Sequence, residues 1–182
     1  MVRVAHDGTM TLSGNTLVLP IPPERWPPPR AGVAIDGLVL EPKPELHVTL
    51  IGNTLGRELR EVFAEACLTG ALDEAFASQR WDFDRTGRFL LLRKPLTEKG
   101  RGGVAHSLIE RIELPAMAPF HHALGGLLGR QLPIPPPHVT MYTAGRAQGI
   151  GVASASRLRV LAVREVSARE LAGQVSSARK HG

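Results

Sequence analysis

The spacing of apolar residues along the chain alternates between two periods, and this predicts a mixed α+β fold. Short runs of β-branched and apolar residues bounded by glycine or proline are typical of strands. Besides two proline-flanked segments described below, such runs lie at 16–19, 33–40, 89–92, 106–114 and 158–166. Within the second run, Asp36-Gly37 indicates either a bulge or a tight turn.

Three other segments place apolar residues at the spacing of three and four that is typical of helices. The first follows Asn53 or Thr54, either of which is suited to cap a helix, and the second spans about 71–79. The third contains Phe120 and Leu124. The first helix is expected to bury one face against the sheet, formed by Leu55, Leu59, Val62, Phe63, Ala66 and Cys67. Two neighbouring histidines of the third helix, His121 and His122, are not expected to chelate a metal together, because adjacent helical positions diverge by about 100°. We expect them to lie on a solvated face.

Two segments are expected to be irregular. Residues 20–30 hold six prolines around Trp26, which predicts an extended surface loop packed down by its tryptophan. Residues 93–103 combine Arg93, Lys94, Lys99 and Arg101 with three glycines, without the spacing of a nucleotide-binding loop. We expect a flexible basic loop there.

Composition narrows the class of protein. A chain of 182 residues fits one domain, 1–182, and its polar ends, 1–14 and 176–182, are expected to be flexible. The net charge of +5 favours an anionic partner, although a genomic preference for arginine would give the same charge. The single cysteine, Cys67, excludes an intrachain disulfide. Without a signal-peptide pattern or a long apolar run, we expect a cytoplasmic monomer that does not bind membranes.

The candidate chemistry lies in a repeated motif, P-x-x-H-V-T-[LM]. It occurs at 44–50 and again at 135–141. Because side chains alternate along a strand, His47 and Thr49 share one face, and His138 and Thr140 share one face of the second copy. Imidazole can act as base and as acid near neutral pH, and threonine hydroxyls can donate hydrogen bonds to phosphate oxygens.

The paired H-x-T-hydrophobic motifs resemble those of the 2H phosphoesterase superfamily, which includes 2′-5′ RNA ligase-like proteins and RNA 2′,3′-cyclic phosphodiesterases. The resemblance implies a bilobal α+β fold with two antiparallel-rich sheets, flanking helices and pseudo-two-fold symmetry around a central groove. It also implies hydrolysis, or ligation in reverse, of 2′,3′-cyclic or 2′-5′ phosphate groups on RNA ends or nucleotides, without a metal or other cofactor. His47 and His138 would be catalytic, and Thr49 and Thr140 would bind phosphate.

Two alternatives remain at this stage. The same fold would serve a non-catalytic module that binds the phosphate of RNA or a nucleotide. A metallohydrolase that uses His47 and His138 is less well supported, because no further ligand stands at a fixed short spacing from either histidine.

The two copies differ one step beyond the motif. Continued strand alternation places Ile51 on the face of the first pair and Tyr142 on the face of the second. We therefore predict that Tyr142 lies at the groove, where its ring would stack on a base or its hydroxyl would meet the phosphate. A tyrosine that only packs at the edge of the groove is the alternative.

Overall fold

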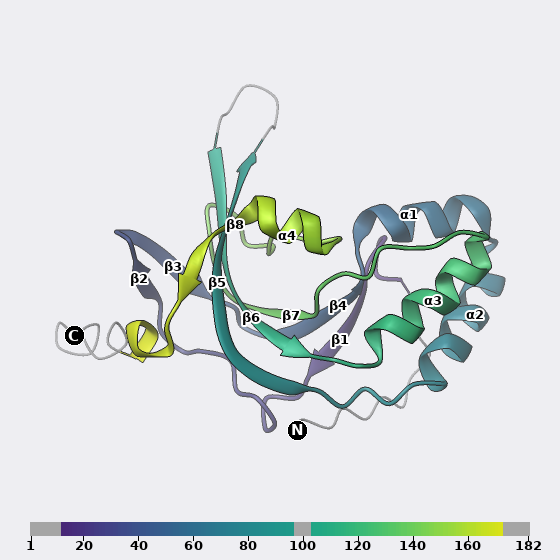
Figure 1. The fold of residues 1–182 in the computed structure, drawn as a ribbon, viewed down its shortest axis with the longest axis horizontal. Helices are drawn as coiled ribbons and strands as arrows, with labels where there is room; N and C mark the ends of the chain where they lie inside the picture. The colour runs from purple at the N-terminus through teal and green to yellow at the C-terminus, as the bar shows by residue number, and fades with distance from the viewer. Residues whose placement is uncertain (1–11, 97–102, 173–182) are drawn as a thin grey trace.

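A single antiparallel sheet of eight strands forms the centre of the protein in a computed structural model that describes residues 12–96 and 103–172 (Figure 1). The strand order is β1-β4-β7-β6-β5-β8, with β3 also paired to β7 and β2 paired to β3. The strands are β1 (Leu17–Ile21), β2 (Val33–Ile35), β3 (Leu38–Pro42), β4 (Leu46–Ile51), β5 (Asp84–Leu96), β6 (Gly103–Glu113), β7 (His138–Ala144) and β8 (Ala162–Val166).

The expected α+β class is confirmed, whereas the expected pair of sheets is wrong. Both motif strands belong to one sheet, and the described ranges show neither a second sheet nor a pseudo-two-fold relation between two halves. The β4 and β7 strands pair directly with each other, so they extend one ladder and do not belong to separate lobes. Some predictions concern residues that the structure does not describe. They include most of 1–14, all of 176–182, and the basic residues Lys99 and Arg101.

Helices cover the sheet in two groups (Figure 1). The helices are α1 (Asn53–Val62), α2 (Glu65–Ala77), α3 (Met117–Leu128) and α4 (Ala155–Leu161), followed by a short helical segment at 168–172. The first three lie together, and α4 stands apart from them near β7 and β5. No helix within the described ranges is both long and apolar enough to cross a membrane.

Two clusters of buried side chains divide the core between the two faces of β6. The main cluster includes Leu108 and Ile112 of β6 together with residues of α1, α2 and α3. The smaller cluster contains Ile109 of β6 and residues of α4, such as Leu158 and Leu161. Alternation along β6 thus buries even-numbered positions under the three-helix group and odd-numbered positions near α4.

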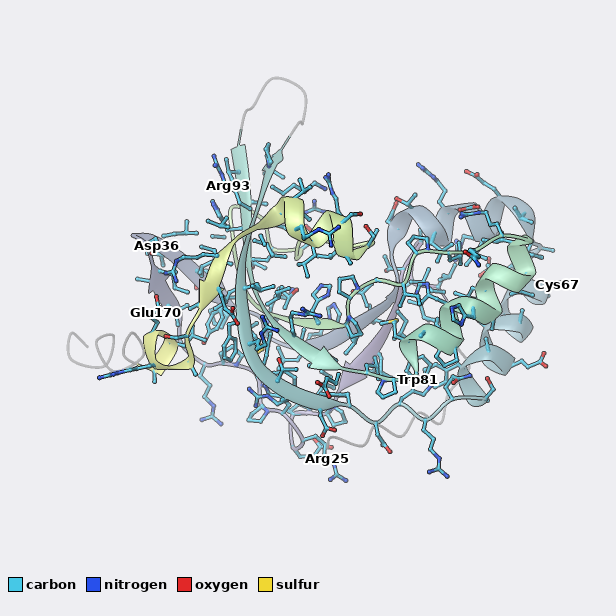
Figure 2. All side chains as sticks on the ribbon, viewed as in Figure 1. Arg25, Asp36, Cys67, Trp81, Arg93 and Glu170 are labelled. Carbon is cyan, nitrogen blue, oxygen red and sulfur yellow. The ribbon has the colours of Figure 1, made fainter. Side chains whose placement is uncertain are left out.

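The first predicted helix is in fact two helices. Its cap is Gly52, which offers no side-chain hydrogen bond, and α1 ends at Val62 before α2 begins at Glu65. The break changes which side chains face the core. Cys67 is therefore exposed on α2 (Figure 2), and the expectation that it lies on a buried face is wrong. Similarly, 158–161 is helical, because Ser154 caps α4 by accepting a hydrogen bond of 3.1 Å from the backbone N–H of Arg157.

Tryptophans anchor two segments that the strands do not hold. The Trp26 side chain is 3 % exposed inside the proline-rich loop, so the predicted surface loop packed by its tryptophan is confirmed. The Trp81 ring stacks on Phe76 at 4.5 Å between centroids and meets the edge of the Phe120 ring at 5.3 Å. Trp81 thereby joins α2 to α3 (Figure 2).

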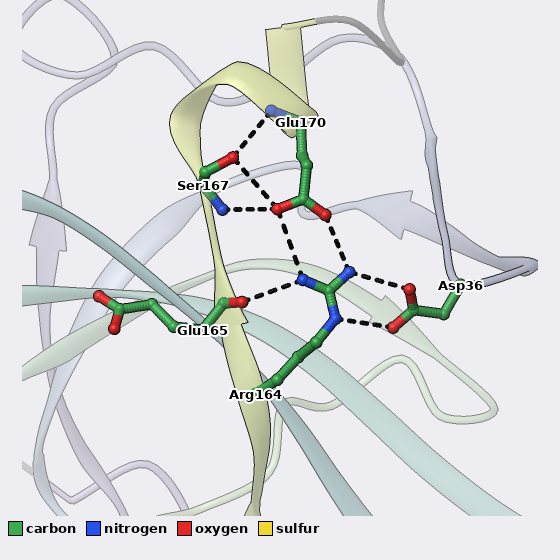
Figure 3. A network of polar contacts seen from close by, with 5 residues as sticks. All are labelled: Asp36, Arg164, Glu165, Ser167 and Glu170. Atoms are coloured by element: carbon green, nitrogen blue, oxygen red, sulfur yellow. Dashed lines mark hydrogen bonds and ion pairs between the residues drawn. The ribbon is translucent and has the colours of Figure 1, made fainter.

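An exposed network of polar contacts ties the β2–β3 turn to the end of β8 (Figure 3). Arg164 donates two hydrogen bonds of 2.9 Å to Asp36 and one of 2.9 Å to Glu170. Asp36 lies at the turn with a positive φ of 54°. The backbone N–H of Ser167 donates to Glu170, and the backbone N–H of Glu170 donates to the Ser167 hydroxyl, as in a capping box. The hydrogen bonds from Arg164 and Ser167 lower the pKa of Glu170 to about 2.

Candidate active site

The sheet brings the two copies of the motif side by side. Strands β4 and β7 run antiparallel with Val48 directly opposite Val139, and these valines are only 1 % and 0 % exposed. Continuing this register by one residue in each direction places His47 across from Thr140 and Thr49 across from His138. All four polar side chains have intermediate exposure, in contrast to the buried valines. Two imidazoles and two hydroxyls therefore share one face of the sheet.

The register also sets the separation of the two histidines. Each histidine faces a threonine across the ladder, so the two histidines are diagonal neighbours, with Cα atoms about 7–8 Å apart. Side chains that extend from such positions can reach opposite sides of one tetrahedral phosphate. The charge of a protonated His47 lowers the pKa of His138, which is consistent with two imidazoles that lie close together.

A backbone hydrogen bond fixes the tautomer of His138. Its Nδ1 lies 2.8 Å from the carbonyl oxygen of Pro136. A carbonyl can only accept, so Nδ1 carries the proton and donates it, and in the neutral ring Nε2 is left with a free lone pair. The proline-rich approach to the motif thus has a defined role, because it supplies the carbonyl that orients the ring.

Burial keeps both imidazoles neutral to a lower pH than usual. For His47, burial is the main cause of a lowered pKa, and the charge of Lys43 adds to it while that of Glu45 opposes it. For His138, burial again dominates, and the charges of His47 and Arg111 lower the pKa further. Hydrogen bonding to Pro136 opposes these effects. At neutral pH both rings are therefore mainly uncharged in the free protein.

A glycine loop closes against one edge of the site. A Cβ atom added to Gly149 would lie 2.8 Å from the Thr140 hydroxyl oxygen, so only glycine fits there without displacing that hydroxyl. Lys43 holds the same loop, because its Nζ donates a hydrogen bond of 3.1 Å to the carbonyl of Ala147. Nothing in the sequence around Gly149 indicates its closeness to Thr140, because the two residues come together only in the folded chain.

Arg111 is a candidate functional residue that the sequence did not reveal. It lies on β6 directly opposite His138, and therefore on the same face of the sheet. Its Nε is buried and has no hydrogen-bond partner in the described part of the chain. The register between β6 and β7 joins residues far apart in sequence, so no local pattern around Arg111 signals its position.

Tyr142 does not share the face of His138 and Thr140, and that prediction is wrong. Thr140 pairs with Ile109 and Tyr142 pairs with Leu108, so β7 advances two residues while β6 advances one. Consecutive residues of β6 point to opposite faces, and this bulge at Met141 therefore reverses the alternation. The Tyr142 side chain is 7 % exposed and belongs to the main core cluster with Leu108. It is on the wrong face of the sheet to stack on a base held between the histidines.

One of the two adjacent histidines of α3 is also placed differently from expectation. His121 is 2 % exposed, and its Nε2 donates a hydrogen bond of 2.9 Å to the carbonyl of Leu50 on β4. It is a buried histidine that joins α3 to the strand carrying His47. His122 is exposed, as predicted.

The remaining predicted features lie away from the motif pair. Arg93 and Lys94 belong to the projecting end of the β5–β6 hairpin, where Arg93 is labelled in Figure 2. Across residues 12–96 and 103–172, no group of three or more His, Cys, Asp or Glu side chains is arranged to hold a metal ion. The structure therefore adds no ligand to His47 and His138 within these ranges.

Comparison of the chain with protein-family models finds no match. Curated proteins and solved structures likewise yield no match. The functional argument therefore depends on the motif and on its geometry.

Proposed function

We propose that the protein is a phosphoesterase that hydrolyses 2′,3′-cyclic phosphate or 2′-5′ phosphodiester groups, or joins them in the reverse direction, on RNA ends or nucleotides. The observation that carries the proposal is the direct pairing of β4 and β7, which gathers His47, Thr49, His138 and Thr140 on one face. Two proton-transfer groups flank a place where two hydroxyls can donate to phosphate oxygens. The proposal takes from the 2H superfamily its motif chemistry, and not its two-sheet architecture.

The hydrogen bond between His138 and Pro136 supports different roles for the two histidines. The Nδ1–H of His138 donates to the Pro136 carbonyl, so the neutral ring has its lone pair on Nε2. His138 is therefore suited to remove a proton from the attacking water. His47, when protonated, would then give a proton to the departing ribose oxygen. In the reverse reaction the roles exchange.

The two threonines are suited to stabilise the phosphate as it gains charge. Each lies across the ladder from a histidine, so each hydroxyl is close to the path of one proton transfer. Hydroxyls already held by a rigid strand stabilise the transition state without a further cost of reorganisation.

The pH dependence of kcat/KM tests the paired use of the histidines. One ring must be neutral and the other protonated, which gives a rate that rises and then falls with pH. Because the pKa values of both rings are lowered, we expect the optimum of kcat/KM in the free enzyme to lie below the ordinary histidine pKa of about 6.5. A profile measured with a cyclic nucleotide between about pH 4 and 9 checks this. A monotonic profile would count against paired acid and base catalysis.

Treatment with a chelator tests whether the two histidines act without a metal. The two imidazoles and two hydroxyls supply both proton transfers and the phosphate contacts, so we expect turnover to persist after dialysis against a strong chelator. The matched control is the same protein dialysed without chelator. Loss of turnover that zinc or manganese restores would favour a metallohydrolase.

A further inference from the structure

Arg111 is a charged side chain beside the motif pair, and its Nε has no hydrogen-bond partner among the described residues. The other arginines near it on β5 are engaged: Arg85 donates to Glu110 at 2.7 Å, and Arg88 donates to Glu165 at 3.1 Å. The Arg111 side chain is of intermediate exposure, but its Nε is buried and has no hydrogen-bond partner within the described ranges. A buried N–H of a charged group lowers the stability of the folded protein when it has no acceptor. The presence of such a group at this position therefore needs an explanation.

The position of Arg111 supplies that explanation. It pairs with His138 across the ladder, where directly opposite Cβ atoms are about 4.5–5.5 Å apart. Its positive charge acts on the His138 ring. It also borders a cavity of about 380 Å³ on the side away from the motif residues, and the other residues that line this cavity are Asp84, Arg85, Thr86, Arg88, Ile112 and Glu113.

We propose that Arg111 binds the phosphate of the substrate, as the third side of a site whose other sides are the two H-x-T pairs. Rigid and planar, a guanidinium presents two parallel N–H donors that match two phosphate oxygens. A phosphate bound beside Arg111 and His138 would accept hydrogen bonds from the guanidinium. Its negative charge would also neutralise the positive charge of Arg111. This inference rests on the proposed function for the identity of the ligand, but Arg111 as an anion-binding residue stands on geometry alone.

Binding of inorganic phosphate and of a nucleoside 2′-monophosphate, measured by calorimetry, tests the inference. We expect Arg111→Met to weaken binding by about 10- to 100-fold, because a hydrogen bond to a charged group is lost. Arg111→Lys should restore part of the affinity, since it keeps the charge but not the bidentate geometry. Arg88→Met, in the same cavity but paired with Glu165, is the matched control and should bind as the wild type does.

A second measurement separates binding from a merely structural role. Removing the positive charge of Arg111 should raise the pKa of His138, which an NMR titration of the histidine ring protons reports. Arg111→Met should not lower the midpoint of thermal unfolding, because it removes a buried donor that has no partner. Unchanged phosphate affinity in folded Arg111→Met, or no phosphate binding by the wild type, would overturn the inference.

The outcome for Arg111 can be told apart from the outcome for the proposed function. If Arg111→Met turns over a cyclic nucleotide as fast as the wild type, Arg111 has no role in the reaction. The proposed phosphoesterase function would still stand. Phosphate binding that depends on Arg111, in a protein that turns over no phosphoester, would support the anion site and contradict the enzyme.

Discussion

Replacing His138 or His47 with alanine is expected to lower turnover of a 2′,3′-cyclic nucleotide by about 100-fold or more. Either change removes one of the two groups that can move protons on the shared face of β4 and β7. Because both side chains are partly exposed and the strands are held by Val48 and Val139, the variants should fold normally. Steady-state kinetics, with circular dichroism to confirm folding, provides the measurement.

Two further substitutions sharpen this experiment. His138→Asn can still place a side-chain amide near Pro136 and donate to its carbonyl, but it cannot transfer a proton at the position of Nε2. We expect it to be as inactive as His138→Ala. His122→Ala is the matched control, since His122 is an exposed histidine of α3, and its turnover should be that of the wild type. A folded His138→Ala variant that retains most of its turnover would remove His138 from the mechanism.

Replacing Arg85 with methionine is expected to lower the free energy of unfolding by about 1–3 kcal/mol, because a buried carboxylate loses its half-exposed partner. Glu110 on β6 has a side chain that is 0 % exposed, and Arg85 neutralises it through hydrogen bonds of 2.7 and 3.0 Å. Without Arg85, the one hydrogen bond to this carboxylate that remains among the described residues comes from the backbone N–H of Gly87, at 3.2 Å. The guanidinium also lies 4.0 Å from the centre of the Trp26 ring, so its loss loosens the proline-rich loop as well.

Urea denaturation measures this effect, and two variants control for it. Arg57→Met breaks an exposed pair with Glu61 on α1, which should change stability by less than about 1 kcal/mol. The double variant Arg85→Met, Glu110→Gln removes the buried charge together with its partner, and it should recover part of the loss. Equal stability of Arg85→Met and Arg57→Met would show that Glu110 does not depend on Arg85.

The sequence was sufficient to predict the local structure of the two motifs. Their alternation placed each histidine on the same side as its threonine, and the buried valines between them agree with that prediction. It did not determine how the two strands would meet. Direct pairing of β4 with β7 is a contact between residues about 90 positions apart, and the resemblance to a two-sheet family suggested a different arrangement.

The errors have specific physical causes. Tyr142 was misplaced because a bulge at Met141 reverses the alternation, and no residue of β7 signals an extra position. Cys67 was misplaced because a break at 63–64 rotates α2 relative to α1. Arg111 and the buried His121 were missed because their positions depend on tertiary contacts, with β7 and with the carbonyl of Leu50. Local patterns report periodicity and do not report these long-range contacts.

The central claim is that the two motifs form one catalytic site, and a double-mutant cycle tests it most directly. Turnover of a 2′,3′-cyclic nucleotide is measured for the wild type, His47→Ala, His138→Ala and the double variant. Residues that act as a unit have non-additive effects. We therefore predict that the wild type turns over and that the double variant is about as inactive as either single variant. No turnover by the folded wild type, or a loss in the double variant equal to the product of the two single losses, would contradict the claim.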